Sequence, residues 1–145
     1  MKNAIIICLS LAGFFIITAF LISHSSASLK VEIQGLRSSE GFVLLSLFKD
    51  GNGYPDEPEK AFRKIKISIK GKKASTDLAD LPNAAYAIVV LHDENSNLKM
   101  DKSLGIPNEG YGFSNNVVGL MGPPSFSKAS FRIEGNQLLE IKMRY

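Results

Sequence analysis

The stretch Lys64-Ile65-Lys66-Ile67-Ser68-Ile69-Lys70 alternates strictly between polar and apolar side chains. Successive side chains of a β-strand point to opposite faces of the sheet, so a period of two predicts a strand that is buried on one face only. Beyond residue 27 the sequence offers no convincing helical period. The alternation therefore predicts an all-β fold.

The other expected strands are of two kinds. Alternating segments are typical of strands with one solvated face, whereas near-continuous apolar runs are typical of central strands. The expected strands are Leu29–Gln34, Phe42–Phe48, Ala74–Leu78, Ala85–Leu91 and a final hairpin of Ser125–Ile133 with Gln137–Met143. Turn residues separate these segments, so the sequence predicts an antiparallel Greek-key β-sandwich of six to seven strands.

Apolar residues are concentrated at the N-terminus. The run Ala4–Ile22 is followed by Ser25-Ser26-Ala27, which places small residues where a signal peptidase cleaves. We expect residues 1–27 to be a signal peptide and residues 28–145 to form a single exported domain, periplasmic or extracellular. The alternative is an uncleaved membrane anchor, because 19 largely apolar residues nearly span a bilayer.

Cysteine and histidine are scarce in this domain. The single cysteine, Cys8, lies in the leader, and His92 is the only histidine after residue 27. Disulfide scaffolds, cysteine zinc sites, thiol nucleophiles and multi-histidine metal centres are therefore excluded from the domain. The formal net charge of the whole chain is only +3, which together with the expected export argues against a nucleic-acid partner.

Basic residues cluster in residues 60–73, which contain seven of the 17 lysines and arginines and no acidic residue. One interpretation is a surface for an anionic glycan, a lipid headgroup or a nucleic acid. The interpretation we favour is a solvated strand face whose lysines protect a sheet edge from pairing with another chain.

Residues 92–124 form a connection longer than a compact sandwich normally needs, and such loops are usually functional or disordered. Apolar anchors spaced among its glycines and prolines predict an ordered loop. We expect the segment 92–116 to form a binding surface. Its candidate residues are His92, Asp93, Glu94, Asn95, Asn97, Asp101, Glu109, Tyr111, Ser114 and Asn115.

Four of these residues suggest calcium, the one candidate cofactor. Asp93, Asn95, Asn97 and Asp101 present oxygen-bearing side chains at the spacing that opens a helix-flanked calcium loop. The glycine expected at the sixth position of such a loop is replaced by Leu98. The alternative is that these side chains cap turns and bond the loop backbone.

His92 is the one residue of the domain that could act as an ordinary general base near neutral pH. A hydrolase or small-molecule-binding enzyme would use it with a neighbouring carboxylate. However, no G-x-S-x-G elbow is present, and adjacent residues of a strand, such as His92 and Asp93, point to opposite faces. We therefore identify no catalytic residue.

The segments Tyr86–Asn95 and Glu109–Asn116, with Asn97, Asp101 and Gly105-Ile106-Pro107 between them, resemble the signature of an uncharacterised bacterial exported family, domain of unknown function 2141. The resemblance implies a prealbumin-like or carboxypeptidase-regulatory-like sandwich, and it implies no activity. Members of this family typically carry glycine where this chain has Ser96 or Leu98.

Together these features predict an exported, non-enzymatic binding or accessory module. Its 92–116 loop would form a recognition surface or an ion-stabilised surface, and the candidate partners are a cell-envelope protein or a glycan. The alternative function is a hydrolase or small-molecule-binding enzyme that uses His92. A membrane-anchored accessory subunit would follow if the leader were retained.

Overall fold

The computed structural model describes residues 27–145. The apolar run expected to form a signal peptide or an anchor lies in residues 1–26, outside the described residues. Among the helices of residues 27–145, none is long and apolar enough to cross a membrane.

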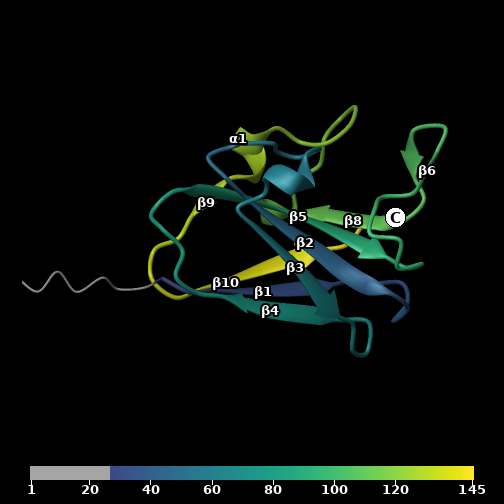
Figure 1. The fold of residues 1–145 in the computed structure, drawn as a ribbon, viewed down its shortest axis with the longest axis horizontal. Coiled ribbons are helices and arrows are strands. Elements are labelled where there is room, and N and C mark those ends of the chain that lie inside the picture. The colour runs from purple at the N-terminus through teal and green to yellow at the C-terminus, as the bar shows by residue number, and fades with distance from the viewer. Residues whose placement is uncertain (1–26) are drawn as a thin grey trace, which may run out of the picture.

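Two main β-sheets lie face to face (Figure 1). The smaller sheet has the strand order β10-β1-β4, and the larger sheet has the order β3-β2-β5-β8, with β9 also paired to β5. The strands of the smaller sheet are β1 (Leu29–Gln34), β4 (Ala74–Leu78) and β10 (Gln137–Lys142). Those of the larger sheet are β2 (Phe42–Lys49), β3 (Arg63–Ser68), β5 (Ala85–Asp93), β8 (Gly110–Phe113) and β9 (Phe131–Arg132).

The remaining elements are short. A two-residue hairpin, β6 (Lys102–Ser103) with β7 (Ile106–Pro107), projects from the long connection. The helical turns are η1 (Pro58–Lys60), η2 (Ser114–Asn116) and α1 (Phe126–Ala129). None of these turns belongs to the sandwich itself, and all of them lie in the connections between its strands.

The core lies between the two sheets and is built from alternate residues of each strand. Val31 and Ile33 of β1 and Val43 and Leu47 of β2 have no exposed surface, and all belong to one apolar cluster. Burial of one face of each sheet is what the alternating sequence predicts. The prediction of an all-β sandwich is therefore confirmed.

The predicted C-terminal hairpin is wrong. Residues 126–129 form the helical turn α1, and the two-residue strand β9 pairs with β5 in the larger sheet. Strand β10 instead pairs in parallel with β1 in the smaller sheet. The physical reason is that the two segments lie in different layers of the sandwich, where Phe131 pairs with Tyr86 of β5 and Gln137 pairs with Leu29 of β1.

Strand β8 also differs from expectation, because it lies within residues 92–124, which we expected to form one long loop. Gly110 and Gly112 lie in this strand opposite His92 and Val90 of β5. A Cβ atom on Gly112 would lie 2.8 Å from Cγ2 of Ile141 in β10. The absence of a side chain therefore lets β10 of the other sheet approach β8 closely.

The basic cluster lies at a sheet edge, as the favoured interpretation requires. Strand β3 is the outer strand of the larger sheet, and Lys64 and Lys66 are exposed while Ile67 is buried. Lysines on an edge strand oppose pairing with the edge of another molecule.

Candidate functional site

The outer face of the larger sheet is apolar where a solvated sheet would be polar. Leu44 of β2 lies directly opposite Leu91 of β5, which in turn lies opposite Tyr111 of β8. Val89 occupies the next outward position of β5 and is only half-buried, like these three. An antiparallel sheet in a sandwich commonly buries one face and solvates the other with polar side chains. This sheet therefore has a second apolar face outside the core.

Three loop segments turn this face into a groove of about 1030 Å³. Residues 55–58 lie at one side, and the 98–107 segment and the 117–123 segment form two walls, named here the first and second wall. In Figure 1 the first wall carries β6, and the second wall is the yellow-green loop between η2 and α1. Both walls expose large apolar side chains, with Ile106 at 69% and Leu120 at 99% of their full accessibility. The groove is thus apolar on its floor and on its walls.

An aromatic cluster covers the adjoining part of the outer face. The ring of Tyr54 meets the rings of Phe48, Phe126 and Phe113 edge-on at centroid distances of 5.5, 5.6 and 6.5 Å. The Tyr54 hydroxyl has no hydrogen-bond partner within residues 27–145, and burial raises its pKa to about 12. The aromatic cluster therefore covers one part of the outer face, and the groove is the part that stays open.

Two buried carboxylates fix the loop that leads into the first wall. Asp93 has no exposed surface, and its two oxygens accept hydrogen bonds from the backbone amides of Asn97 and Leu98 at 3.0 and 2.9 Å. Glu109 accepts the amides of Glu94 and Asp101 at 3.0 and 3.1 Å. Each carboxylate thus satisfies two loop amides that have no strand partner. The loop is held by its own side chains.

The four expected calcium ligands are divided by this arrangement. The side-chain amides of Asn95 and Asn97 donate to Asp101 at 2.6 and 2.9 Å, so these three side chains meet, while Asp93 is directed at the loop backbone. In the described part of the chain, no group of three or more His, Cys, Asp and Glu side chains could hold a metal ion. The contacts correspond to the turn-capping alternative, and calcium binding stays a prediction.

His92 faces the core instead of the groove. Its ring has no exposed surface, its Nε2–H donates to the carbonyl of Glu40 at 2.9 Å, and Nδ1 lies 2.7 Å from the hydroxyl of Tyr145. Asp93, the next residue, points to the opposite face of the sheet. Both ring nitrogens are therefore occupied by groups of the protein. The carboxylate of Glu94 lies 4.0 Å from Nδ1.

A surface ion pair closes the end of the sheet beside His92. The guanidinium of Arg37 donates to the Glu94 carboxylate from Nη2 and from Nε, whose single N–H is shared between the two oxygens at 3.0 Å. It also lies 4.5 Å above the ring of Tyr145. The hydrogen bond from Arg37 holds the pKa of Glu94 below its usual range, although partial burial of the carboxyl acts in the other direction. Sequence reasoning missed Arg37 and Tyr145, since no pattern links residues so far apart in the chain.

The last candidates have structural roles. Ser114 is buried and accepts the backbone amide of Ile88 at 2.9 Å. Asn115 donates to the carbonyl of Ser130 at 3.0 Å, and the neighbouring Asn116 accepts the amide of Lys142 at 2.7 Å. These contacts join η2 to α1 and to β10. Among the ten predicted binding residues, Tyr111 alone lines the groove.

The groove floor could have been found from the sequence. The runs Phe42–Phe48 and Ala85–Leu91 are apolar at outward as well as inward positions, which we attributed only to a central place in the sheet. Leu44, Val89 and Leu91 are outward members of these runs, and the polar Ser46 lies opposite Val89 on the same face. The apolar character of Leu44, Val89 and Leu91 is the signal that sequence reasoning left unused.

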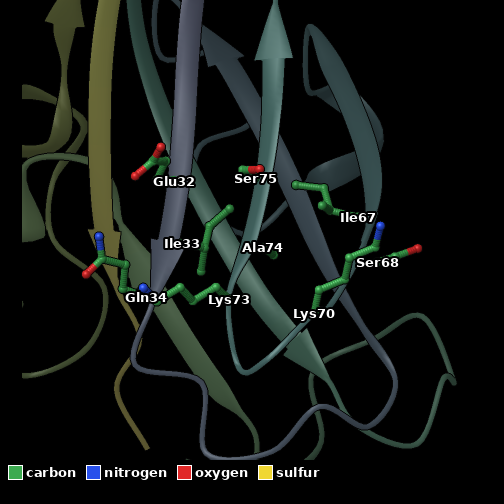
Figure 2. Close-up of a pocket in the computed structure, with 9 residues that line it drawn as sticks. All are labelled: Glu32, Ile33, Gln34, Ile67, Ser68, Lys70, Lys73, Ala74 and Ser75. Atoms are coloured by element: carbon green, nitrogen blue, oxygen red, sulfur yellow. The ribbon is translucent and has the colours of Figure 1, made fainter.

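A second hollow of about 550 Å³ lies where the two sheets diverge (Figure 2). Figure 2 shows Glu32 of β1 and Ser75 of β4 at one side and Lys70, just after β3, at the other. Its lining is largely polar, and it contains none of the predicted site residues. It is an opening between two sheet edges.

Comparison with known families decides the relationship of the chain. Residues 31–141 match a family described as "Uncharacterized protein conserved in bacteria (DUF2141)". The chain belongs to this family. No curated protein and no solved structure is significantly similar to the chain. The resemblance to DUF2141 is thus confirmed, while the prealbumin-like relationship of its sandwich stays a prediction.

The geometry accounts for the glycines that the resemblance implies in place of Ser96 or Leu98. Ser96 and Leu98 adopt φ values of 63° and 67°, which lie in the left-handed region that glycine enters without steric cost. This chain keeps the backbone conformation with other residues. The hydrogen bonds that Asp93 accepts from Asn97 and Leu98 stabilise the turn in which both strained residues lie.

Proposed function

We propose that this DUF2141 protein is an exported, non-enzymatic binding module that takes an apolar ligand into the groove on the outer face of its larger sheet. The observation that carries the proposal is the apolar outward row of Leu44, Leu91 and Tyr111, extended by exposed apolar side chains on both walls. Soluble proteins rarely expose contiguous apolar surface without a binding role. Pockets of this order of size commonly hold small molecules.

The predicted recognition loop has a defined place in this proposal. Residues 93–97 and 109 form a hydrogen-bonded base, and the first wall projects from it. A wall held in one conformation loses less entropy when a ligand binds. The loop therefore contributes by shaping the groove, and its apolar residues Leu98 and Ile106 contribute the contact surface.

The surroundings of His92 support a non-enzymatic role. A general base must reach the proton that it abstracts from a substrate. The ring of His92 is fully buried, and both its nitrogens lie within hydrogen-bond distance of groups of the protein. Catalysis by His92 with Asp93 or Glu94 would require this packing to open.

Export is part of the proposal and rests on the sequence alone. The apolar run Ala4–Ile22 and the small residues before Ser28 support it. A protein outside the cytoplasmic membrane would meet its ligand in the cell envelope or beyond it. The predicted partners, an envelope protein or a glycan, could still bind elsewhere, because the groove occupies only the outer face of the larger sheet.

The test is binding of an uncharged apolar dye, N-phenyl-1-naphthylamine, to the protein purified from a bacterial host. We expect the dye to bind. We expect Leu91→Asp to weaken binding at least about tenfold, because the bound dye would displace the water that hydrates a carboxylate on the floor. Ile106→Asp, on the exposed first wall, tests the same point without changing a strand of either main sheet.

The matched control is Leu138→Asp, since Leu138 is 57% exposed on β10 of the other sheet and does not line the groove. Equal loss of dye binding in Leu138→Asp and Ile106→Asp would show that the dye does not report the groove. Absence of dye binding by the wild-type protein would refute the proposal.

A further inference from the structure

The charges around the groove are strongly one-sided. Among its lining residues, Asp56 is the single acidic residue and five are basic. The basic residues are Lys64, Lys66, Lys99, Lys102 and Arg144. The chain as a whole is nearly balanced, with 17 basic and 14 acidic residues. The apolar groove is thus surrounded by a local excess of positive charge.

These cations are not neutralised by the protein itself. Within residues 27–145, no carboxylate lies within 4.0 Å of the ammonium group of any of the four lysines. The ammonium of Lys66 lies 3.6 Å from the centroid of the Phe42 ring, and Arg144 donates to the carbonyl of Asn116 at 3.4 Å. Neither contact removes a charge. The positive field is therefore available to an anion from outside.

The floor is unsuited to an extended peptide. Strand β2 is paired on both sides, by β3 and β5, and β5 is paired by β2 and β8. The free edge that borders the floor is that of β3, where Lys64 and Lys66 oppose pairing, and peptide groups pressed onto Leu44, Val89 and Leu91 would remain unsatisfied. An alkyl chain has no such polar groups. The floor matches an alkyl chain better than a peptide.

From these features we infer that the groove binds a fatty acid. The alkyl chain lies against Leu44, Val89 and Leu91, and the carboxylate lies among the basic residues of the rim. Apolar burial supplies most of the affinity, and the cations select the ionised headgroup. The inference rests on the proposed function and adds the chemical class of the ligand.

The experiment compares laurate with dodecanol, which has the same alkyl chain and no charge. Each competes with N-phenyl-1-naphthylamine for the protein purified from a bacterial host. We expect laurate to displace the dye at a concentration about tenfold lower than dodecanol, because several nearby cations attract the carboxylate and not the hydroxyl. High salt should reduce this preference.

A charge-neutralised variant locates the effect. In the test variant, all four groove lysines are replaced: Lys64→Gln, Lys66→Gln, Lys99→Gln and Lys102→Gln. The control carries Lys70→Gln, Lys72→Gln, Lys73→Gln and Lys142→Gln, which remove the same charge from exposed positions outside the groove. We expect the test variant to lose the preference for laurate and to keep its affinity for dodecanol, while the control retains both.

The possible outcomes separate the two proposals. Equal displacement by laurate and dodecanol would overturn the fatty-acid inference and leave the apolar groove intact. Failure of the dye to bind at all would overturn both. Tighter competition by an acidic amphipathic peptide than by laurate would assign the groove to a protein partner and would likewise overturn the inference.

Discussion

Glu94 is the clearest case of a residue whose role depends on its neighbours. In the sequence it is one of several carboxylates after a buried strand. In the folded chain it accepts hydrogen bonds from Arg37 and from the hydroxyl of Ser38 at 3.0 Å. Arg37 in turn covers the ring of Tyr145, whose hydroxyl lies 2.7 Å from Nδ1 of His92. Glu94 thus holds Arg37 over Tyr145, which contacts the buried His92.

Replacement of Glu94 should make stability less dependent on pH. The pKa of Glu94 is lower in the folded protein than its ordinary value of 4.5. The ionised carboxylate therefore stabilises the folded state above that value, and the contribution is lost as the pH falls through the folded-state pKa. We expect Glu94→Gln to lower the free energy of unfolding by about 1 kcal/mol at neutral pH.

Urea unfolding measured at a series of pH values tests this expectation. The difference between wild type and Glu94→Gln should shrink as the pH falls below 4.5. Glu134→Gln serves as the control, because Glu134 is exposed and its side chain makes no ion pair within residues 27–145. A stability difference that stays constant down to low pH would contradict the assigned role of the ion pair.

Among the elements, the loop between β5 and β8 has contacts that differ most from those that its sequence suggests. Its acidic and amide side chains resemble an ion-binding set, but their contacts are mainly with the backbone and with one another. Asp and Asn commonly form such local bonds in turns. The loop is ordered by the same residue types that a calcium site would use.

We expect the melting temperature to change by less than about 1 °C when calcium or EDTA is added. Both oxygens of Asp93 already accept backbone amides, and Asp101 already accepts the amides of two asparagines. Thermal unfolding followed by circular dichroism measures the effect. A rise with calcium that EDTA reverses and that Asp101→Asn abolishes would instead establish the predicted ion site.

The elements also show where prediction from sequence succeeds. Strands β1, β2, β3 and β5 were located by their alternation or their apolar runs. Strand β8 was missed, since Gly110-Tyr111-Gly112 resembles a turn. The strand expected over Ser125–Ile133 is present only as β9, and it pairs with β5 instead of β10. The parallel pairing of β1 with β10 was also missed, because pairing depends on which edges meet in space.

At the scale of the whole molecule, the predicted leader would determine where the groove acts. We expect the protein purified from a bacterial host to lack residues 1–27, because small residues end the apolar run at Ala27. Intact-mass spectrometry distinguishes this product from the full chain. Recovery of the full-length mass in the membrane fraction would favour the anchored alternative and would place the groove beside a bilayer.

The sequence by itself determined the fold class and the family, and it located the long patterned connection. These follow from local periodicity and from motifs that are continuous in the chain. Only the tertiary structure decided that His92 is enclosed, that the acidic loop bonds itself, and that Leu44, Leu91 and both walls form one groove. The alternation of a strand predicts which of its side chains share a face. What that face contacts depends on the packing of segments that are distant in the chain.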